Sequence, residues 1–131
     1  VFEGDEKYLL GEFWKYFRHN NEAQWVGHNT HNFDWPFLIK RSWKLGVPVA
    51  SGIKDGKWYR KNLRDTMEMF CGGGYGDRIS LDRLARYFGV GSKGGASGAH
   101  FAEQYHNDKP AAIKYLYNDL AMTQAVFERM I

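Results

Sequence analysis

Hydrophobic residues recur at every third or fourth position in three stretches of the chain, which is the pattern of a helix with one buried face. We expect helices over residues 6–18 and 81–88, and a last helix from Pro110 onward. Asp5 and Ser80 stand before the first two helices, where a side-chain oxygen can cap a helix. The predicted buried faces are, in chain order, Leu10, Phe13, Trp14 and Phe17; Leu81, Leu84, Ala85 and Phe88; and Ile113, Leu116, Tyr117, Leu120 and Phe127.

Strand signals are sparse by comparison. Residues 25–28 are short and apolar, which favours a buried strand, and residues 57–64 include a weaker candidate. Pro36 suits the first turn of a further helix, so Asp34 falls at the corner between a strand and that helix. Two shorter helices are also expected, over residues 67–71 and 99–105.

Helices that alternate with a few strands indicate an α/β domain. The strands predicted here are too few to make a sheet for this many helices. Strands upstream of Val1 would complete such a sheet. We therefore expect residues 1–131 to form part of a domain rather than all of it.

The composition is that of a globular chain and leaves the partner open. Aromatic residues make up 17% of the 131 residues, which serves either a core of large rings or surfaces that stack on bases. The formal net charge of +3 permits an anionic partner without requiring one. A single cysteine, Cys71, excludes an internal disulfide and a cysteine-based zinc cluster, and it suits a reducing, cytoplasmic compartment. No apolar stretch approaches the ~20 residues that span a membrane, so no membrane partner is expected.

Candidate chemistry gathers first around the end of the predicted strand. Asn29 and Asp34 follow that strand, and ligand sites of open α/β sheets lie beyond the carboxyl ends of strands. A carboxylate there can hold a hard cation, and an amide can bind a substrate edge. Asp34 equally suits a helix cap before Pro36, so its position alone does not distinguish a cation ligand from a helix cap.

A second candidate lies on the last predicted helix. Tyr115 and Asp119 are four residues apart, so they share one helical face and border its apolar stripe. Such a carboxylate could bind metal, and the phenol one turn away could position water. By spacing alone, an exposed aspartate beside a packed tyrosine is the commoner arrangement.

Together the two segments resemble motifs of the proofreading 3′–5′ exonuclease domains of B-family DNA polymerases. They are still more similar to the stand-alone predicted exonucleases related to those domains. Asn29, Phe33 and Asp34 match the second exonuclease motif, Asn-x3-Phe-Asp-x-Pro, and Tyr115-x3-Asp119 matches the third motif in its tyrosine form.

Further elements of the resemblance follow in the family's order. Residues 63–67 resemble a strand that carries an aspartate, here Asp65. Ser80-Leu81-x2-Leu84 matches a Ser/Thr-Leu-x-x-hydrophobic element that contacts the single strand. The glycine-rich loop around Lys93 resembles the loop that follows it in the stand-alone members.

The resemblance implies a ribonuclease H-like exonuclease fold and a two-metal mechanism on the 3′ end of single-stranded DNA, or of RNA. Two Mg²⁺ or Mn²⁺ ions would lie ~3.5–4 Å apart. Asp34 and Asp119 would be ligands, with their carboxylates within roughly 4–7 Å of each other. Tyr115 would orient the attacking water rather than act as a strong base, since a phenol stays protonated near neutral pH. Asn29 and Phe33 would contact the terminal nucleotides, whereas Ser80, Leu81 and Lys93 would line the path of the strand.

Other readings of the chain have weaker support. Gly89-x-Gly91-x2-Gly94 fits a dinucleotide-binding pattern but follows a helix instead of a strand. His28 and His31 are loosely spaced for a metal site and have no cysteine beside them. Two further functional classes stay open, namely a catalytically inactive nucleic-acid-binding module of the same fold and a structural or dimerisation domain. The sequence indicates no particular protein partner.

One departure from the family pattern matters for activity. The first motif of such exonucleases is Asp-x-Glu, and this triplet occurs nowhere in the chain. The family carries that motif upstream of the point where this chain begins. The resemblance therefore implies a partial exonuclease domain over residues 1–131, not a different chemistry.

We predict that residues 1–131 alone have no exonuclease activity, because two of the four carboxylates that would hold two Mg²⁺ ions are missing. Binding of a single strand should suffer less, since it depends on stacking and backbone charge. Incubation of the chain with a 5′-labelled single strand and Mg²⁺ or Mn²⁺ checks this. Robust metal-dependent digestion would mean that the catalytic carboxylates lie elsewhere in these residues.

Overall fold

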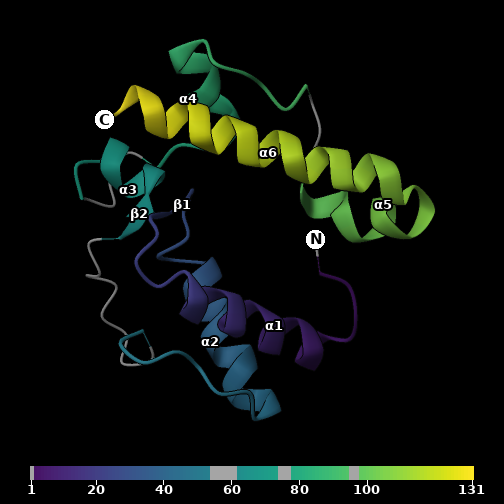
Figure 1. Ribbon diagram of the computed structural model, residues 1–131. Coiled ribbons are helices and arrows are strands. Elements are labelled where there is room, and N and C mark those ends of the chain that lie inside the picture. Colours follow the sequence, from purple (N-terminus) through teal and green to yellow (C-terminus); the bar gives the residue numbers. More distant parts are fainter. Residues whose placement is uncertain (1, 54–61, 74–77, 95–97) are drawn as a thin grey trace. The chain divides into compact units, whose positions relative to one another are not determined.

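The computed structural model describes residues 2–53, 62–73, 78–94 and 98–131 (Figure 1). It is a mixed α/β structure, mostly helical, that divides into two compact units, Val1–Asp65 and Thr66–Ile131. We call them the N-terminal unit and the C-terminal unit. The elements are α1 (Glu6–His19), β1 (Trp25–Gly27), α2 (Asp34–Leu45), β2 (Leu63–Asp65), α3 (Thr66–Phe70), α4 (Leu81–Phe88), η1 (Gly98–His100), α5 (Phe101–Asn107) and α6 (Lys109–Arg129).

Helix α1 begins and ends within one residue of its predicted bounds. The Asp5 carboxylate caps it by accepting a hydrogen bond of 2.8 Å from the backbone N–H of Tyr8. Helix α1 packs beside α2, as Figure 1 shows. Arg41 of α2 reinforces this pair by donating two hydrogen bonds to the Glu6 carboxylate of α1.

Large rings fill the core of the N-terminal unit. Trp14 and Phe17 are fully buried, as the periodicity of α1 predicts. The indole N–H of Trp14 donates to Ser42 Oγ at 2.8 Å, and Ser42 Oγ donates to the carbonyl of Leu38 at 2.7 Å. This pair of bonds satisfies the polar atoms that α1 and α2 bury between them. The buried core comprises Leu10, Trp14, Phe17, Trp35, Ile39, Val47, Ala50, Ile53 and Leu63.

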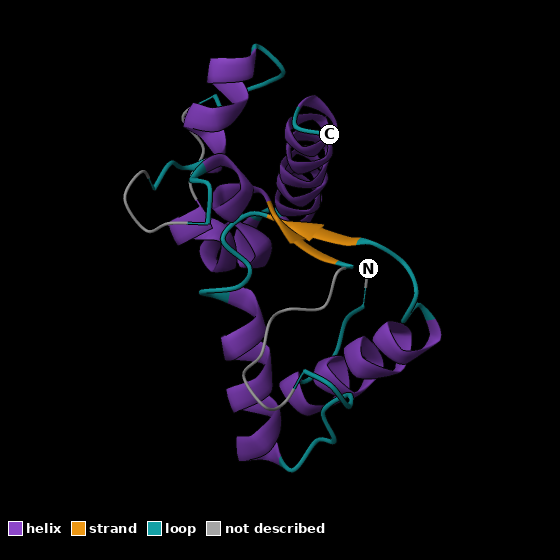
Figure 2. Ribbon diagram, turned by 90° about the vertical axis from the view of Figure 1, so that its left-hand side faces the viewer, coloured by secondary structure: helices purple, strands orange, loops and turns teal. Residues whose placement is uncertain are grey.

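The sheet of the N-terminal unit pairs β1 with β2 in parallel (Figure 2). Trp25 lies opposite Leu63, and Gly27 lies opposite Asp65. The strand predicted over residues 25–28 is therefore confirmed within one residue. Strand β2 overlaps the end of the weaker candidate, of which residues 57–61 lie outside the described residues. Within the described residues the sheet has two strands, so the ribonuclease H-like arrangement and the partial domain stay predictions.

The C-terminal unit is built on α4 and α6, which pack together. Ser80 Oγ accepts a hydrogen bond of 3.2 Å from the Arg83 N–H, and Gly89 ends α4 in the left-handed conformation with φ of 68°. Both signals confirm the helix predicted over residues 81–88. The predicted helix over residues 99–105 appears as a 3₁₀ turn, η1, followed by α5. The buried core of this unit comprises Leu81, Leu84, Ala85, Met122 and Val126.

The buried face predicted for α6 is wrong in the middle of the helix, although Ile113 near its start is half-buried. Leu116, Tyr117 and Leu120 are 39%, 59% and 63% exposed, whereas Phe127 is buried as expected. Helix α6 packs against α3, α4 and α5, and these neighbours decide which of its faces is covered. The spacing of apolar residues along α6 contains no information about where those neighbours lie. The face that the structure buries consists of Ala112, Met122, Thr123, Val126 and Phe127.

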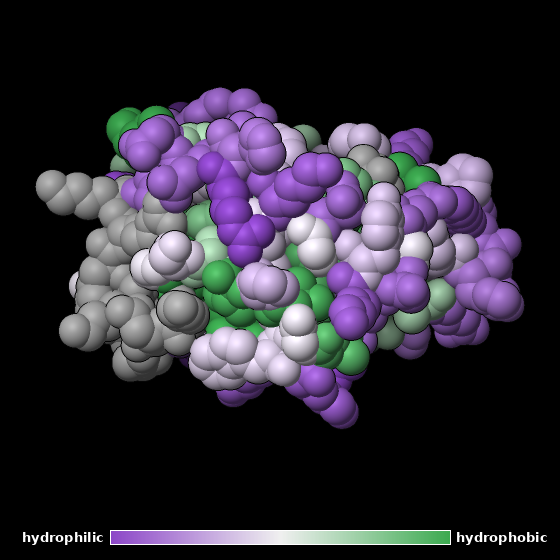
Figure 3. Space-filling view, turned by 60° about the horizontal axis from the view of Figure 1, so that its bottom comes forward, coloured by the Kyte–Doolittle hydropathy of each residue, from purple (hydrophilic) through white to green (hydrophobic). Residues whose placement is uncertain are grey.

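The surface is mostly polar with apolar side chains in places. On the face drawn in Figure 3, hydrophilic side chains surround a smaller group of hydrophobic ones. Among the described residues, no helix combines the length and the apolar character needed to cross a membrane.

We predict that Ser42→Ala destabilises the N-terminal unit by about 1–3 kcal/mol, because it leaves the buried Trp14 N–H without its acceptor. Urea unfolding followed by tryptophan fluorescence measures this unit, since all five tryptophans lie in residues 1–65. Ser51→Ala, at an exposed position, is the matched control and should leave the midpoint unchanged. Equal midpoints for the two variants would contradict the assigned role of Ser42.

Candidate functional site

The C-terminal unit brings together three of the predicted site residues. Tyr115 and Asp119 lie one turn apart on α6, and Lys93 comes from the loop after α4. Lys93 Nζ donates to Tyr115 Oη at 3.0 Å and to Asp119 Oδ2 at 3.2 Å. The same ammonium lies 5.3 Å from the centre of the Tyr115 ring. One cation thus holds the phenol and the carboxylate of the third motif in a fixed relation.

The loop that carries Lys93 is itself held at two points. The backbone N–H of Lys93 donates to Asp82 Oδ1 at 2.6 Å, and Asp82 Oδ2 lies 3.1 Å from Arg86 Nε. Gly91 lets the loop run close to α6, because a β-carbon there would lie 3.1 Å from Met122 Cγ. Gly91 therefore serves backbone approach to α6 and Gly89 ends α4, which agrees with rejecting the dinucleotide-binding interpretation.

The charges at this cluster leave one acceptor open. Asp119 Oδ1 is buried and has no hydrogen-bond partner among the described residues. Buried carboxylate oxygens are nearly always hydrogen-bonded, so the open oxygen of Asp119 could take a metal ion or a water as its partner. Burial lowers the pKa of the Lys93 ammonium, but its hydrogen bonds to Tyr115 and Asp119 and the nearby charges outweigh burial and leave that pKa raised. Lys93 therefore stays protonated beside Asp119.

In the N-terminal unit, the second motif follows the end of β1. Asn29 has a left-handed backbone with φ of 59°, and its N–H donates to Asp65 Oδ1 at 2.8 Å. The N–H of His31 donates to Asp65 Oδ2 at 2.9 Å. Asp65 is only 2% exposed. Sequence reasoning gave Asp65 no role of its own, although its place at the end of β2 marked it as a neighbour of the loop after β1.

Asp34 is the first residue of α2, and Phe33 occupies the capping position. The interpretation of Asp34 as the helix cap is therefore wrong. Although the residue is exposed overall, partial desolvation raises the pKa of its carboxyl group. A hydrogen bond from its own backbone N–H opposes that shift, and repulsion from Asp65 adds to it. A cation near Asp34 would stabilise the ionised carboxylate and so oppose the effects of both the desolvation and the repulsion.

Two rings of α2 stack in parallel at the surface. Phe33 and Phe37 are 62% and 52% exposed, with ring centres 6.1 Å apart and an interplanar angle of 5°. An exposed pair of parallel rings offers a flat face on which another planar group can stack. Sequence reasoning gave Phe37 no role in a site. Its spacing of four residues from Phe33 was the signal that could have paired them.

The remaining predicted residues have structural partners. Ser80 Oγ caps α4, and Leu81 is buried in the core of the C-terminal unit. Their predicted contacts with nucleic acid stay predictions. Asp34 and Asp119 belong to different units, so their approach also stays a prediction.

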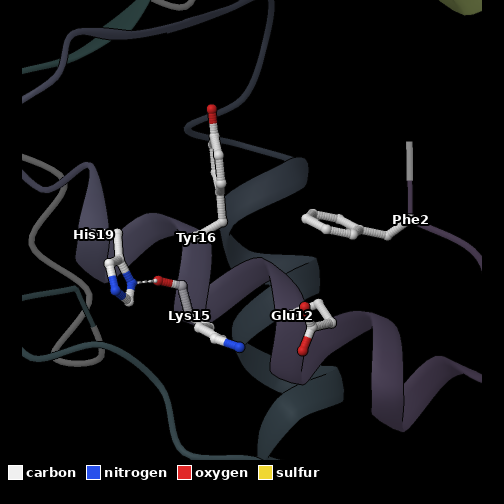
Figure 4. Close-up of a pocket in the computed structure, with 5 residues that line it drawn as sticks. All are labelled: Phe2, Glu12, Lys15, Tyr16 and His19. Atoms are coloured by element: carbon white, nitrogen blue, oxygen red, sulfur yellow. Dashed lines mark hydrogen bonds between the residues drawn. The ribbon is translucent and has the colours of Figure 1, made fainter.

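A pocket of about 240 Å³ opens on the surface of α1 and involves none of these predicted site residues. In Figure 4, its side chains rise from α1 and from the segment before it, and His19 Nδ1 bonds the carbonyl oxygen of Lys15 at 2.9 Å. The pocket is lined by Phe2, Glu12, Lys15, Tyr16 and His19.

Comparison with known proteins confirms the family resemblance of the sequence. A family described as predicted 3′–5′ exonucleases related to the exonuclease domain of PolB matches residues 2–131, and the chain belongs to this family. A DNA polymerase of Archaeoglobus fulgidus is 34% identical over 56 residues, which are 43% of this chain and 7% of that polymerase. The chain thus spans a small part of the length of that relative. No solved structure matches the chain significantly.

We predict that Asp82 titrates below the ordinary aspartate pKa of 3.8, mainly because its carboxylate accepts the Lys93 N–H. Since the folded pKa is lowered, this contact is present above the unfolded pKa and is lost as pH falls through the folded value. The amide shift of Lys93 in an NMR titration reports the loss. In Asp82→Asn that amide should no longer follow an acid titration, and an unchanged curve would contradict the anchoring role of Asp82.

Proposed function

We propose that the protein is a metal-dependent 3′–5′ exonuclease that hydrolyses terminal phosphodiesters of single-stranded DNA, or of RNA. The observation that carries the proposal is the cluster on α6, in which the Lys93 ammonium bonds to both Tyr115 and Asp119. One carboxylate oxygen of Asp119 has no hydrogen-bond partner among the described residues. Membership of an exonuclease family supports it. We infer a cytoplasmic location from the single cysteine, Cys71.

The donors of this chain fit a hard divalent cation such as Mg²⁺ or Mn²⁺. Asp119 offers a carboxylate oxygen without a hydrogen-bond partner among the described residues, and desolvation together with repulsion from Asp65 raises the pKa of Asp34, which a nearby cation would oppose. Oxygen ligands of this type are those that both ions prefer. Two bound ions would supply activation of water for attack on the terminal phosphodiester and stabilisation of the leaving 3′-oxygen. In the proposal, Asp34 and Asp119 hold them together with the carboxylates of an Asp-x-Glu motif.

Lys93 determines what Tyr115 can do. An ammonium has only protons to donate, so Tyr115 Oη is the acceptor of the 3.0 Å bond. The hydroxyl proton of Tyr115 is then directed away from Lys93 and is available to a water or a phosphate oxygen. Tyr115 would orient the attacking water in this way, and it need not lose its proton.

Substrate binding would draw on both units. In the N-terminal unit, the stacked rings of Phe33 and Phe37 offer a surface for bases, and the amide of Asn29 offers hydrogen bonds to the terminal nucleotide. In the C-terminal unit, Lys93 would meet the phosphate backbone of the strand, with Ser80 and Leu81 along its path. The proposed partner is the 3′ end of a single strand.

A catalytically inactive nucleic-acid-binding module is the second candidate. It is supported by the aromatic stack of Phe33 and Phe37, which needs no metal to bind bases. Both candidates bind single strands, and only the exonuclease releases nucleotides from them. A 5′-labelled substrate with Mg²⁺ separates the two when the chain is studied together with the segment that carries Asp-x-Glu.

We predict that, in such a protein, Asp119→Ala abolishes the release of nucleotides from a 5′-labelled single strand, because metal binding is lost. Tyr115→Phe should slow release by ~10²-fold or less, as expected for the loss of one positioning contact. EDTA should stop the reaction altogether.

Tyr117→Phe is the matched control, since it makes the same change at an exposed position two residues along α6. It should leave the rate unchanged. Negligible effects of both Asp119→Ala and Tyr115→Phe would refute the catalytic assignment.

A further inference from the structure

The buried carboxylate of Asp65 makes a specific pair of bonds to the loop after β1. Its two oxygens accept the backbone N–H groups of Asn29 and His31, at 2.8 and 2.9 Å. An aspartate carboxylate that is 2% exposed is costly to bury unless its charge is compensated by such donors. The bonds therefore stabilise the carboxylate and the loop together.

The loop needs this support because its backbone is unusual. Among the described residues, Asn29 is the non-glycine residue with a positive φ, at 59°. Left-handed backbone is unfavourable for a residue with a β-carbon, although asparagine tolerates it better than most. The turn before it is also tight, because a β-carbon at Gly27 would lie 2.1 Å from Cγ2 of Thr30. Gly27 is the register partner of Asp65, so the carboxylate stands directly beside the turn.

We propose that Asp65 is a positioning residue that acts through Asn29. Its carboxylate holds the left-handed backbone at Asn29 and thereby sets the direction of the amide that meets the terminal nucleotide. This inference rests on the proposed function, since it assigns the Asn29 side chain to nucleic acid. Asp65 itself is too deeply buried to contact the nucleic acid.

A carboxylate is the side-chain group best suited to accept both backbone N–H groups, those of Asn29 and His31. Two N–H donors require two acceptor oxygens, and an ionised aspartate provides acceptors alone. In Asp65→Asn, one oxygen is replaced by an NH₂ group that would face a backbone N–H, so one bond is lost and two donors oppose each other. The side chain keeps its size, so the variant changes hydrogen bonding and charge with little change in packing.

The test is a cycle of Asp65→Asn, Asn29→Gly and the double variant in the 131-residue chain. Glycine accepts the left-handed backbone without support, so Asn29→Gly removes the amide and keeps the loop compatible with folding. Asp5→Asn is the matched control, because its carboxylate also accepts a backbone N–H in the same unit, from Tyr8 at 2.8 Å. Tryptophan fluorescence verifies that each variant is folded in this unit.

Two quantities are measured, the hydrogen exchange of the Asn29 and His31 amides by NMR and the affinity for a 5′-fluorescein oligodeoxynucleotide with a free 3′ end. Affinity is measured in EDTA, so that an effect on metal binding cannot contribute. Asp65→Asn should accelerate both exchanges and weaken binding by about tenfold, the scale of one misplaced hydrogen-bonding group. The double variant should bind no more weakly than Asn29→Gly, and Asp5→Asn should bind as the wild type does.

Wild-type affinity in the Asp65→Asn variant would overturn the positioning role, as would additive losses in the double variant. Unchanged exchange of both amides in Asp65→Asn would overturn it as well. Absence of binding by the wild-type chain to this oligonucleotide and to an oligoribonucleotide of the same sequence is a different result, because it would remove the proposed nucleic-acid function itself.

Discussion

The parallel pairing of β1 with β2 is the constraint on which the chemistry of the N-terminal unit depends. It sets Gly27 opposite Asp65 and brings the carboxyl ends of both strands to one edge. The loop after β1 can then bond to a carboxylate that lies 36 residues further along the chain. Asn29 and Asp34 both belong to the segment held in this way, so a slip of one register position would move the motif away from its support.

Charge balance plays the corresponding role in the C-terminal unit. Asp82 holds the backbone of Lys93, and the side chain of Lys93 holds Tyr115 and Asp119. The Tyr-x3-Asp motif on α6 therefore depends on a loop that lies outside the motif. The arrangement satisfies one oxygen of Asp119 and leaves the other without a hydrogen-bond partner among the described residues.

Local signals in the sequence predicted the elements well and their packing less well. Asp5, Ser80 and Gly89 act at helix ends, where the effect of a side chain on the backbone is local, and these predictions were confirmed. The buried face of α6 failed because several neighbouring helices decide it, and periodicity contains no information about them. Lys93 was predicted to line the path of the nucleic-acid strand, but its bonds to Tyr115 and Asp119 were not predicted. These bonds join residues 22 and 26 positions apart in the sequence, so they depend on tertiary packing. The aromatic pair of Phe33 and Phe37 could have been predicted, because its spacing is local.

Features that cost stability in this chain gather in the segments with exonuclease motifs. Asn29 adopts left-handed backbone, the pKa of Asp34 is raised, and Asp119 buries an oxygen without a partner. In the same segment as Asn29 and Asp34, Phe33 and Phe37 expose stacked rings to water. A chain under selection for stability alone would relieve each of these by ordinary substitutions, since such changes are easy to find. A cation would compensate the charges of Asp34 and Asp119, and a base would cover the stacked rings, so the coincidence of these features with the motifs is itself an argument for binding.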